Sequence, residues 1–202
     1  MMRSFPDRLR RAVLRFRREE DASATVEYVL IFVPLMVMIF FIFEMAMAYH
    51  WALAAQKGVE NGVRYAVTQA PMHSSLIDTD GTVVKYQLAG SSKPGDLCYF
   101  GTYCSQIATV TCTGGASMAP ECNAAFMARL LDVVSQHAYG LDAESLTITY
   151  AESGLGRATE TVIPIITVSI SSRDFPLGLS LMGIDTKLPA VSATLVAENM
   201  GS

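Results

Sequence analysis

Three histidines are the residues in this sequence best suited to acid–base chemistry or metal binding, and none has the neighbours that such chemistry needs. His50 lies at the edge of an apolar segment, His73 lies in a polar stretch, and His137 lies near the expected C-terminal end of a helix, where a cation is favourable. No HExxH, GxSxG, P-loop or GxGxxG motif occurs. We therefore predict no active site, no metal ion and no cofactor, and we expect that the chain is not an enzyme.

Two other stretches match binding or catalytic motifs only in part. Asp78 and Asp80 stand two residues apart, but the twelve-residue calcium-loop pattern is missing, so Asp80 and Gly81 indicate a turn. Ser180 is flanked by leucines and lacks the glycines of a nucleophile elbow. Neither stretch supports an enzyme or a small-molecule substrate.

Four cysteines lie close together in the middle of the chain. They are Cys98, Cys104, Cys112 and Cys122. An even number of cysteines in an oxidising compartment predicts two disulfides, and the sequence does not choose among the three pairings. A zinc site is disfavoured because the cluster has no CxxC pair and no histidine. Residues 98–122 are rich in Gly, Thr and Ser, so we interpret them as a loop that disulfides would order.

Two glutamates, Glu27 and Glu44, border an apolar segment. No residue from Tyr28 to Phe43 is charged, which makes sixteen residues, whereas a membrane-spanning helix needs about 20. Extending the helix across Glu44 to Tyr49 reaches that length. A carboxylate in lipid is costly unless it reaches an interface or a partner. We therefore predict one transmembrane helix over residues 23–50, with each acid placed against a membrane surface or a neighbouring protein.

Charge is spread unevenly along the 202 residues. Before Ser23, seven arginines and four acids give a net charge of +3, and from Ser23 on, eight basic and fifteen acidic residues give −7. An acidic folded part is not expected to bind nucleic acid. The basic start instead predicts a cytoplasmic leader over residues 1–22, because Lys and Arg stay on the side from which insertion occurs. Residues 51–202 would then form a domain outside the cytoplasm.

The helical pattern continues beyond the membrane segment. Apolar residues recur at three- and four-residue spacing as far as Pro71, which predicts one helix over residues 24–69. Gly58 and Gly62 share a face of this helix, and we expect a neighbouring helix or sheet to approach closely there, as at a contact with another subunit.

The rest of the chain predicts a small α+β fold. Strands are expected at residues 82–89, 145–152, 158–172 and 187–198, the third with a bend at Pro164. A second helix is expected from Pro120 and Glu121 to Gly140. We therefore expect an antiparallel sheet packed on the amphipathic half of the first helix, with a second short helix and a disulfide-stapled loop.

Residues 174–185 are strongly apolar for a connection between two strands. Phe175, Leu177 and Leu179 lie in this stretch. They form either an exposed patch for a partner subunit or a segment that folds back into the core, and the sequence does not separate these two interpretations.

The start of the apolar segment resembles a known family. Residues 23–52, SATVEYVLIFVPLMVMIFFIFEMAMAYHWA, are similar to the N-terminus of TadE-like pseudopilins of the tight-adherence (Flp/Tad) type IV pilus system. The resemblance rests on a small-residue stretch, a Val-Glu-Tyr group, an early proline and a glutamate near the end of the apolar run. The matching residues are Val26, Glu27, Tyr28, Pro34 and Glu44.

The resemblance implies a minor pilin held in the bacterial inner membrane, with its C-terminal domain periplasmic or in an extracellular pilus. Its partners would be other pilin-like subunits and a prepilin peptidase that cuts between Ala22 and Ser23. Glu27 would then meet the new N-terminal amine of a neighbouring subunit. Tyr28 and Glu44 would also contact pilin-like subunits, and Glu44 would face a different neighbour because it lies roughly 100° around the helix from Glu27. Because Ala22 stands where this family usually has glycine, the unprocessed chain stays an alternative.

Two further interpretations of the segment stay open. Ala46-Met47-Ala48 fits the A-x-A pattern of a signal peptidase site, so cleavage after Ala48 would release a secreted binding or adhesin-like domain. The segment is also compatible with a plain single-span anchor. The sequence leaves open the position of the protein in a pilus and its stoichiometry.

Overall fold

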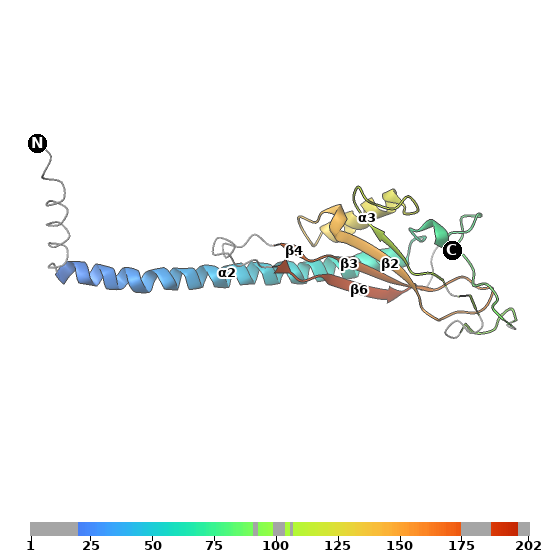
Figure 1. Ribbon diagram of the computed structural model, residues 1–202, viewed down its shortest axis with the longest axis horizontal. Coiled ribbons are helices and arrows are strands. Elements are labelled where there is room, and N and C mark those ends of the chain that lie inside the picture. The colour runs from blue at the N-terminus through green and yellow to red at the C-terminus, as the bar shows by residue number, and fades with distance from the viewer. Residues whose placement is uncertain (1–19, 91–92, 99–103, 106, 175–186, 198–202) are drawn as a thin grey trace, which may run out of the picture.

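The fold combines one very long helix with a small globular domain at its C-terminal end, as the computed structural model shows (Figure 1). The structure describes the chain except for residues 1–19, 91–92, 99–103, 106, 175–186 and 198–202.

The long helix, α2, runs from Glu20 to Val67 and has two different halves. Its first half projects away from the domain, and its second half lies inside it (Figure 1). The buried residues of the second half repeat every three or four positions, and they are Trp51, Ala55, Val59, Val63 and Ala66. This spacing places them on one side of a helix, so the amphipathic pattern sets where the domain begins. The prediction of one continuous helix is confirmed.

A four-stranded antiparallel sheet forms the second layer. Its strands are β1 (Val110–Thr113), β2 (Leu146–Glu152), β3 (Pro164–Ile170) and β6 (Val191–Val196), in the spatial order β1-β2-β3-β6. In β2 and β3 every second residue is buried, and these residues face the helix layer. The other face carries hydroxyl pairs, among them Thr111 with Thr149 and Thr167 with Thr194. Alternation of this kind is typical of a sheet with one packed face and one solvated face.

The helix α3 (Ala124–Ser135) packs beside α2. Its buried residues Met127, Leu130 and Val134 follow helical spacing. The expected start at Pro120 and Glu121 is wrong, because Asn123 caps the helix. Its side-chain oxygen accepts hydrogen bonds from the backbone N–H groups of Ala125 and Phe126, at 3.0 and 3.1 Å, and such a cap satisfies two donors that the first turn leaves unpaired.

Short elements complete the described chain. A second sheet pairs β4 (Arg173–Asp174) with β5 (Lys187–Leu188). Two single-turn 3₁₀ helices cover Ser74–Leu76 and Ala143–Ser145.

Three expectations about strands are corrected. Residues 82–89 form only isolated bridges, at Val83, Lys85 and Leu88. The stretch 158–172 becomes a strand only from Pro164 onward, because proline has no N–H to donate and fits the first position of a strand better than its middle. The cysteine loop also contains an unexpected strand, β1, which pairs with β2 and becomes an edge strand of the sheet.

Both disulfides are present, which confirms the prediction, and the structure chooses the pairing. Cys98 is joined to Cys104, and Cys112 is joined to Cys122. Cys112 lies on β1, whereas Cys122 directly precedes the cap of α3. The second disulfide therefore ties the edge of the sheet to the start of a helix.

Candidate assembly interface on the N-terminal helix

The first half of α2 is an apolar helix that no other described part of the chain covers. From Thr25 to His50 every residue is exposed except Met36, Glu44 and Ala48, which are half-buried. Among the described residues, α2 is the one helix that is long and apolar enough to cross a membrane. Apolar surface of this extent requires lipid or protein around it.

Glu27 and Tyr28 lie at the start of this uncovered half. Tyr28 is 64% exposed, and its ring stacks on that of Phe32, one turn further on, with the ring centres 5.3 Å apart. The stack gives this part of the helix a flat aromatic side. Glu27 is also exposed within the chain, so its carboxylate is available to a neighbouring protein or to the membrane surface.

A shallow apolar groove begins beside Glu27. It is lined by Thr25, Val26, Val29, Leu30, Val33 and Pro34. Pro34 has no N–H, so the helical hydrogen bond to the carbonyl four residues earlier, that of Leu30, is not formed there. Its apolar lining suits a second apolar helix rather than a polar ligand.

Glu44 lies at the other end of the apolar half. Glu44 is seventeen positions after Glu27, which is roughly 25 Å along a straight helix. This separation is close to the thickness of the hydrocarbon core of a membrane, which is about 30 Å.

Gly58 and Gly62 meet α3 of the same chain. A methyl group added at Gly58 would lie 2.7 Å from the backbone oxygen of Val134, and one added at Gly62 would lie 2.7 Å from a methyl group of Val134. The expected close approach of a helix is present, but the partner is internal. The assignment of these two glycines to a contact with another subunit is therefore corrected.

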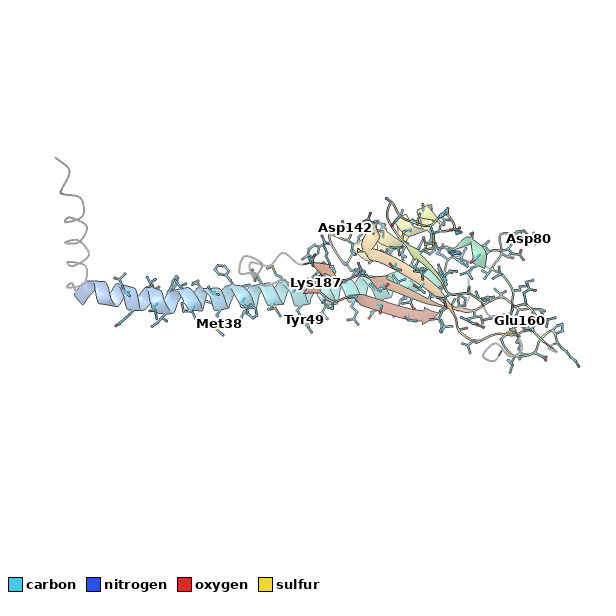
Figure 2. The ribbon with its side chains drawn as sticks, viewed as in Figure 1. Met38, Tyr49, Asp80, Asp142, Glu160 and Lys187 are labelled. Atoms are coloured by element: carbon cyan, nitrogen blue, oxygen red, sulfur yellow. A yellow bond between two sulfur atoms is a disulfide. The ribbon has the colours of Figure 1, made fainter. Side chains whose placement is uncertain are left out.

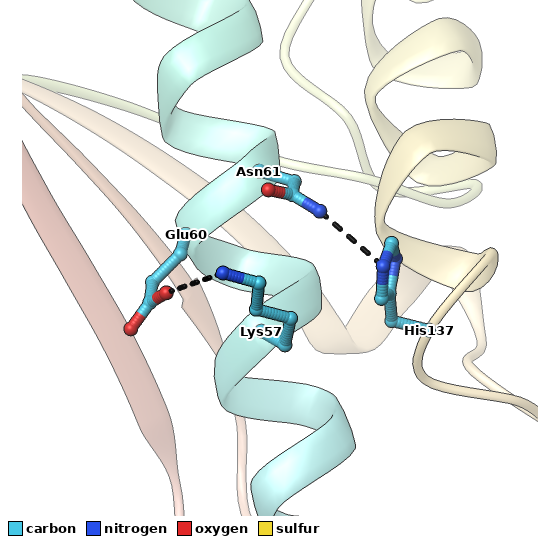
Figure 3. Close-up of polar contacts among 4 residues, drawn as sticks. All are labelled: Lys57, Glu60, Asn61 and His137. Atoms are coloured by element: carbon cyan, nitrogen blue, oxygen red, sulfur yellow. Dashed lines mark hydrogen bonds and ion pairs between the residues drawn. The ribbon is translucent and has the colours of Figure 1, made fainter.

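Polar residues of α2 lie beside this contact, and one of them, Asn61, reaches across to the end of α3. Asn61 contacts the ring of His137 at 3.4 Å, and Lys57 pairs with Glu60 at 3.5 Å (Figure 3). His137 follows α3 and so links the end of that helix to α2 (Figure 3). This histidine has a structural neighbour and no metal-binding cluster around it: the described residues contain no group of three or more His, Cys, Asp or Glu suited to a metal.

The remaining predicted site residues are placed as follows. Ala22 and Ser23 lie in the first turn of α2. Phe175, Leu177 and Leu179 fall outside the described residues.

Sequence reasoning missed the residue that fixes the boundary between the two halves of α2. Trp51 is 2% exposed, and its indole N–H donates to the carbonyl oxygen of Tyr139 at 3.3 Å. The signal was present in the sequence, because Trp51 is the only tryptophan and stands where the apolar run changes to an amphipathic pattern. Tryptophan at such a position combines a large apolar surface with a donor that needs a partner.

Comparison with known proteins identifies the same segment. Residues 22–64 match the family model described as TadE-like protein. The match includes Glu27, Tyr28, Pro34 and Glu44, and it runs from the uncovered half of α2 into the half that packs on the domain. No curated protein and no solved structure matches the chain. The resemblance of this segment is therefore confirmed.

Proposed function

We propose that this chain, whose residues 22–64 match the TadE-like family model, is a membrane-anchored minor pilin that acts in assembly of a Tad pilus. It would initiate, cap or stabilise the pilus through contacts between α2 and the helices of other pilin-like subunits. The role is one of interaction and not of catalysis.

The uncovered apolar half of α2 carries this proposal. The apolar side chains of such a helix are shielded from water by lipid in the membrane, and they stay shielded when helices of other subunits replace the lipid. The groove from Thr25 to Pro34 supports such an exchange, because it offers an apolar seat for a second helix next to Glu27.

Glu27 supplies the specificity in this proposal. Cleavage between Ala22 and Ser23 by a prepilin peptidase would leave a positively charged amine four residues before Glu27. A cation from a neighbouring subunit would lower the cost of keeping the Glu27 carboxylate in an apolar contact. Attraction between the two charges would set the axial register of adjacent helices.

Mass spectrometry of the mature N-terminus tests the processing step. A chain that begins at Ser23 supports the proposal, and one that begins at Met1 indicates an unprocessed anchor. A chain that begins at Tyr49 would support the secreted binding domain instead. The fully buried residues of α2 start at Trp51, so cleavage after Ala48 would leave these residues in the domain. The fold is therefore compatible with both functions, and the mass of the mature N-terminus separates them.

Substitution of Glu27 tests the assembly step. Glu27→Gln removes the charge and keeps the size, and we expect it to reduce pilus formation and crosslinking to other pilin-like subunits while membrane insertion stays normal. Glu60→Gln is the matched control, because Glu60 is on the same helix but outside the apolar half. Normal assembly and processing with Glu27→Gln would refute the proposed pairing.

A further inference from the structure

The end of the globular domain from which α2 emerges carries two exposed aromatic side chains. Tyr49 is 68% exposed and Tyr139 is 61% exposed. The buried Trp51 follows Tyr49 by two residues and donates its indole N–H to the carbonyl of Tyr139. Aromatic residues with a polar group concentrate at the membrane–water interface, where one part of the side chain meets lipid and the other meets water.

The small sheet of β4 and β5 lies at the same end of the domain (Figure 1). Arg173 on β4 donates from its guanidinium to the carbonyl oxygen of Gly140, the residue after Tyr139. Lys187 on β5 has a side chain that is 69% exposed. Figure 2 shows Lys187 and Tyr49 at this end, and Asp80 and Glu160 at the opposite end of the domain. We call Tyr49, Tyr139, Arg173 and Lys187 the basal surface; Trp51, which is buried, is hydrogen-bonded to Tyr139 of this surface.

Helix length places the basal surface relative to the membrane. If Glu27 marks the inner edge of the hydrocarbon layer, then a core of about 30 Å takes about 20 residues and ends near Met47. Tyr49 then lies about 3 Å and Trp51 about 6 Å beyond that edge. A headgroup layer is roughly 5–8 Å thick on each side. We propose that the basal surface rests in the outer headgroup layer of the membrane and seats the domain directly on the bilayer.

The charges of the basal surface indicate the kind of lipid contact. Lys187 has Asp174 at 3.7 Å, so part of its positive charge is balanced within the chain. Both of these side chains are highly exposed, and such a pair contributes little energy. Tyr49 and Tyr139 carry no charge, so the contact that they make with lipid forms on zwitterionic membranes as well. The inference rests on the membrane placement of α2 in the proposed function.

The single tryptophan makes the depth measurable. The full chain is reconstituted in phosphatidylcholine vesicles whose acyl chains carry bromine either near the headgroup or near the methyl end. We expect Trp51 emission to be quenched more strongly by the shallow bromines than by the deep ones. Adding an anionic lipid to the vesicles should leave this difference unchanged. Equal emission in brominated and unbrominated vesicles would overturn the inference.

Introduced cysteines separate this inference from the membrane placement itself. All four native cysteines are in disulfides, so one added cysteine can be labelled alone. A fluorophore at Met38→Cys reports on the apolar half of α2, one at Lys187→Cys on the basal surface, and one at Asp80→Cys on the far end. We expect quenching by brominated lipid at the first two sites and none at Asp80→Cys. Quenching at Met38→Cys without quenching at Lys187→Cys refutes the basal contact alone, whereas no quenching at Met38→Cys refutes the membrane placement.

A substitution tests the contribution of the exposed aromatic ring. Tyr139→Ser keeps the backbone carbonyl that holds Trp51, and we expect it to weaken quenching of a label at Lys187→Cys. Tyr139→Trp should preserve the quenching. Leu155→Ser is the matched control, because Leu155 is a similarly exposed apolar residue, 53% exposed, in the loop after β2. Unchanged quenching with Tyr139→Ser would show that the aromatic ring does not seat the domain.

Discussion

Gly58 packs so closely under Val134 that a methyl group added to the glycine would lie 2.7 Å from the Val134 backbone oxygen. Gly62 meets the same residue at the same distance, but there the opposing atom is a side-chain methyl group. The two glycines thus hold α3 against α2 through different atoms of one residue. Their substitutions are expected to behave differently for that reason.

Gly58→Ala is expected to lower the free energy of unfolding. Overpacking of this kind costs about 1–3 kcal/mol, and the better helix propensity of alanine returns roughly 1 kcal/mol. Thermal unfolding in detergent, followed by near-ultraviolet circular dichroism, measures the difference. Lys57→Ala is the control, because the Lys57 side chain is 56% exposed and its loss should change stability little.

The same method distinguishes the two glycines in a double-mutant cycle. Val134→Ala removes the methyl group that opposes residue 62, so the combination with Gly62→Ala should cost less than the sum of the single changes. The combination with Gly58→Ala should show weaker coupling, because the backbone oxygen at 2.7 Å remains and only the looser contact with a Val134 methyl group at 3.3 Å is lost. Equal coupling in the two cycles would contradict the packing described here.

Loss of the disulfide between Cys112 and Cys122 is expected to destabilise the domain more than loss of the other disulfide. The loops close over 10 and 6 residues, which correspond to about 2.7 and about 2.2 kcal/mol by chain entropy. Cys112 is also fully buried on β1. Replacing both cysteines of one disulfide by alanine, followed by thermal unfolding, tests which disulfide stabilises the domain more. Non-reducing peptide mapping tests the pairing, and a peptide that links Cys104 to Cys112 would disprove the pairing.

Stability should fall at alkaline pH because of Tyr150. Burial raises the pKa of Tyr150 from 10.0 to about 12, so between these two values the unfolded chain releases a proton that the folded chain keeps. The free energy of unfolding is therefore unaffected by this group below pH 10 and decreases as pH rises toward 12, by up to roughly 3 kcal/mol. Denaturant unfolding across this range measures the slope.

Tyr150→Phe provides the comparison for the alkaline effect. It removes the titrating group and should flatten the pH dependence. It also removes the hydroxyl that accepts a hydrogen bond from the Met72 N–H at 3.1 Å, which should cost about 1 kcal/mol at neutral pH. A slope as steep in Tyr150→Phe as in the native chain would assign the alkaline loss to other groups.

Asn123→Ala is expected to destabilise the start of α3 by about 1 kcal/mol, because two backbone N–H groups lose their acceptor. Asn123→Asp keeps an oxygen at the same place and should retain most of the stability. Thermal unfolding compares the three chains. If alanine and aspartate behaved alike, the cap would not contribute as the hydrogen bonds indicate.

The sequence alone determined the parts of the fold that local periodicity specifies. Helical spacing predicted that α2 continues beyond the apolar run, because Ala55, Val59, Val63 and Ala66 must share one side of any helix that contains them. Strict alternation likewise predicted β2, whose neighbours in sequence point to opposite faces of the sheet. The match of residues 22–64 to TadE-like proteins lies in the same N-terminal segment, where short-range pattern carries most of the information.

Only the tertiary structure decided what each local pattern pairs with. Residues 82–89 have the composition of a strand but form only isolated bridges. Residues 110–113 have the composition of a loop but form the strand β1, because they pair with β2. The cysteine pairing and the partner of Gly58 and Gly62 were also undecided, because each depends on which distant segments meet in space. The physical reason is that strand pairing, disulfides and close helix packing are long-range contacts, and the sequence pattern around one partner does not identify the other.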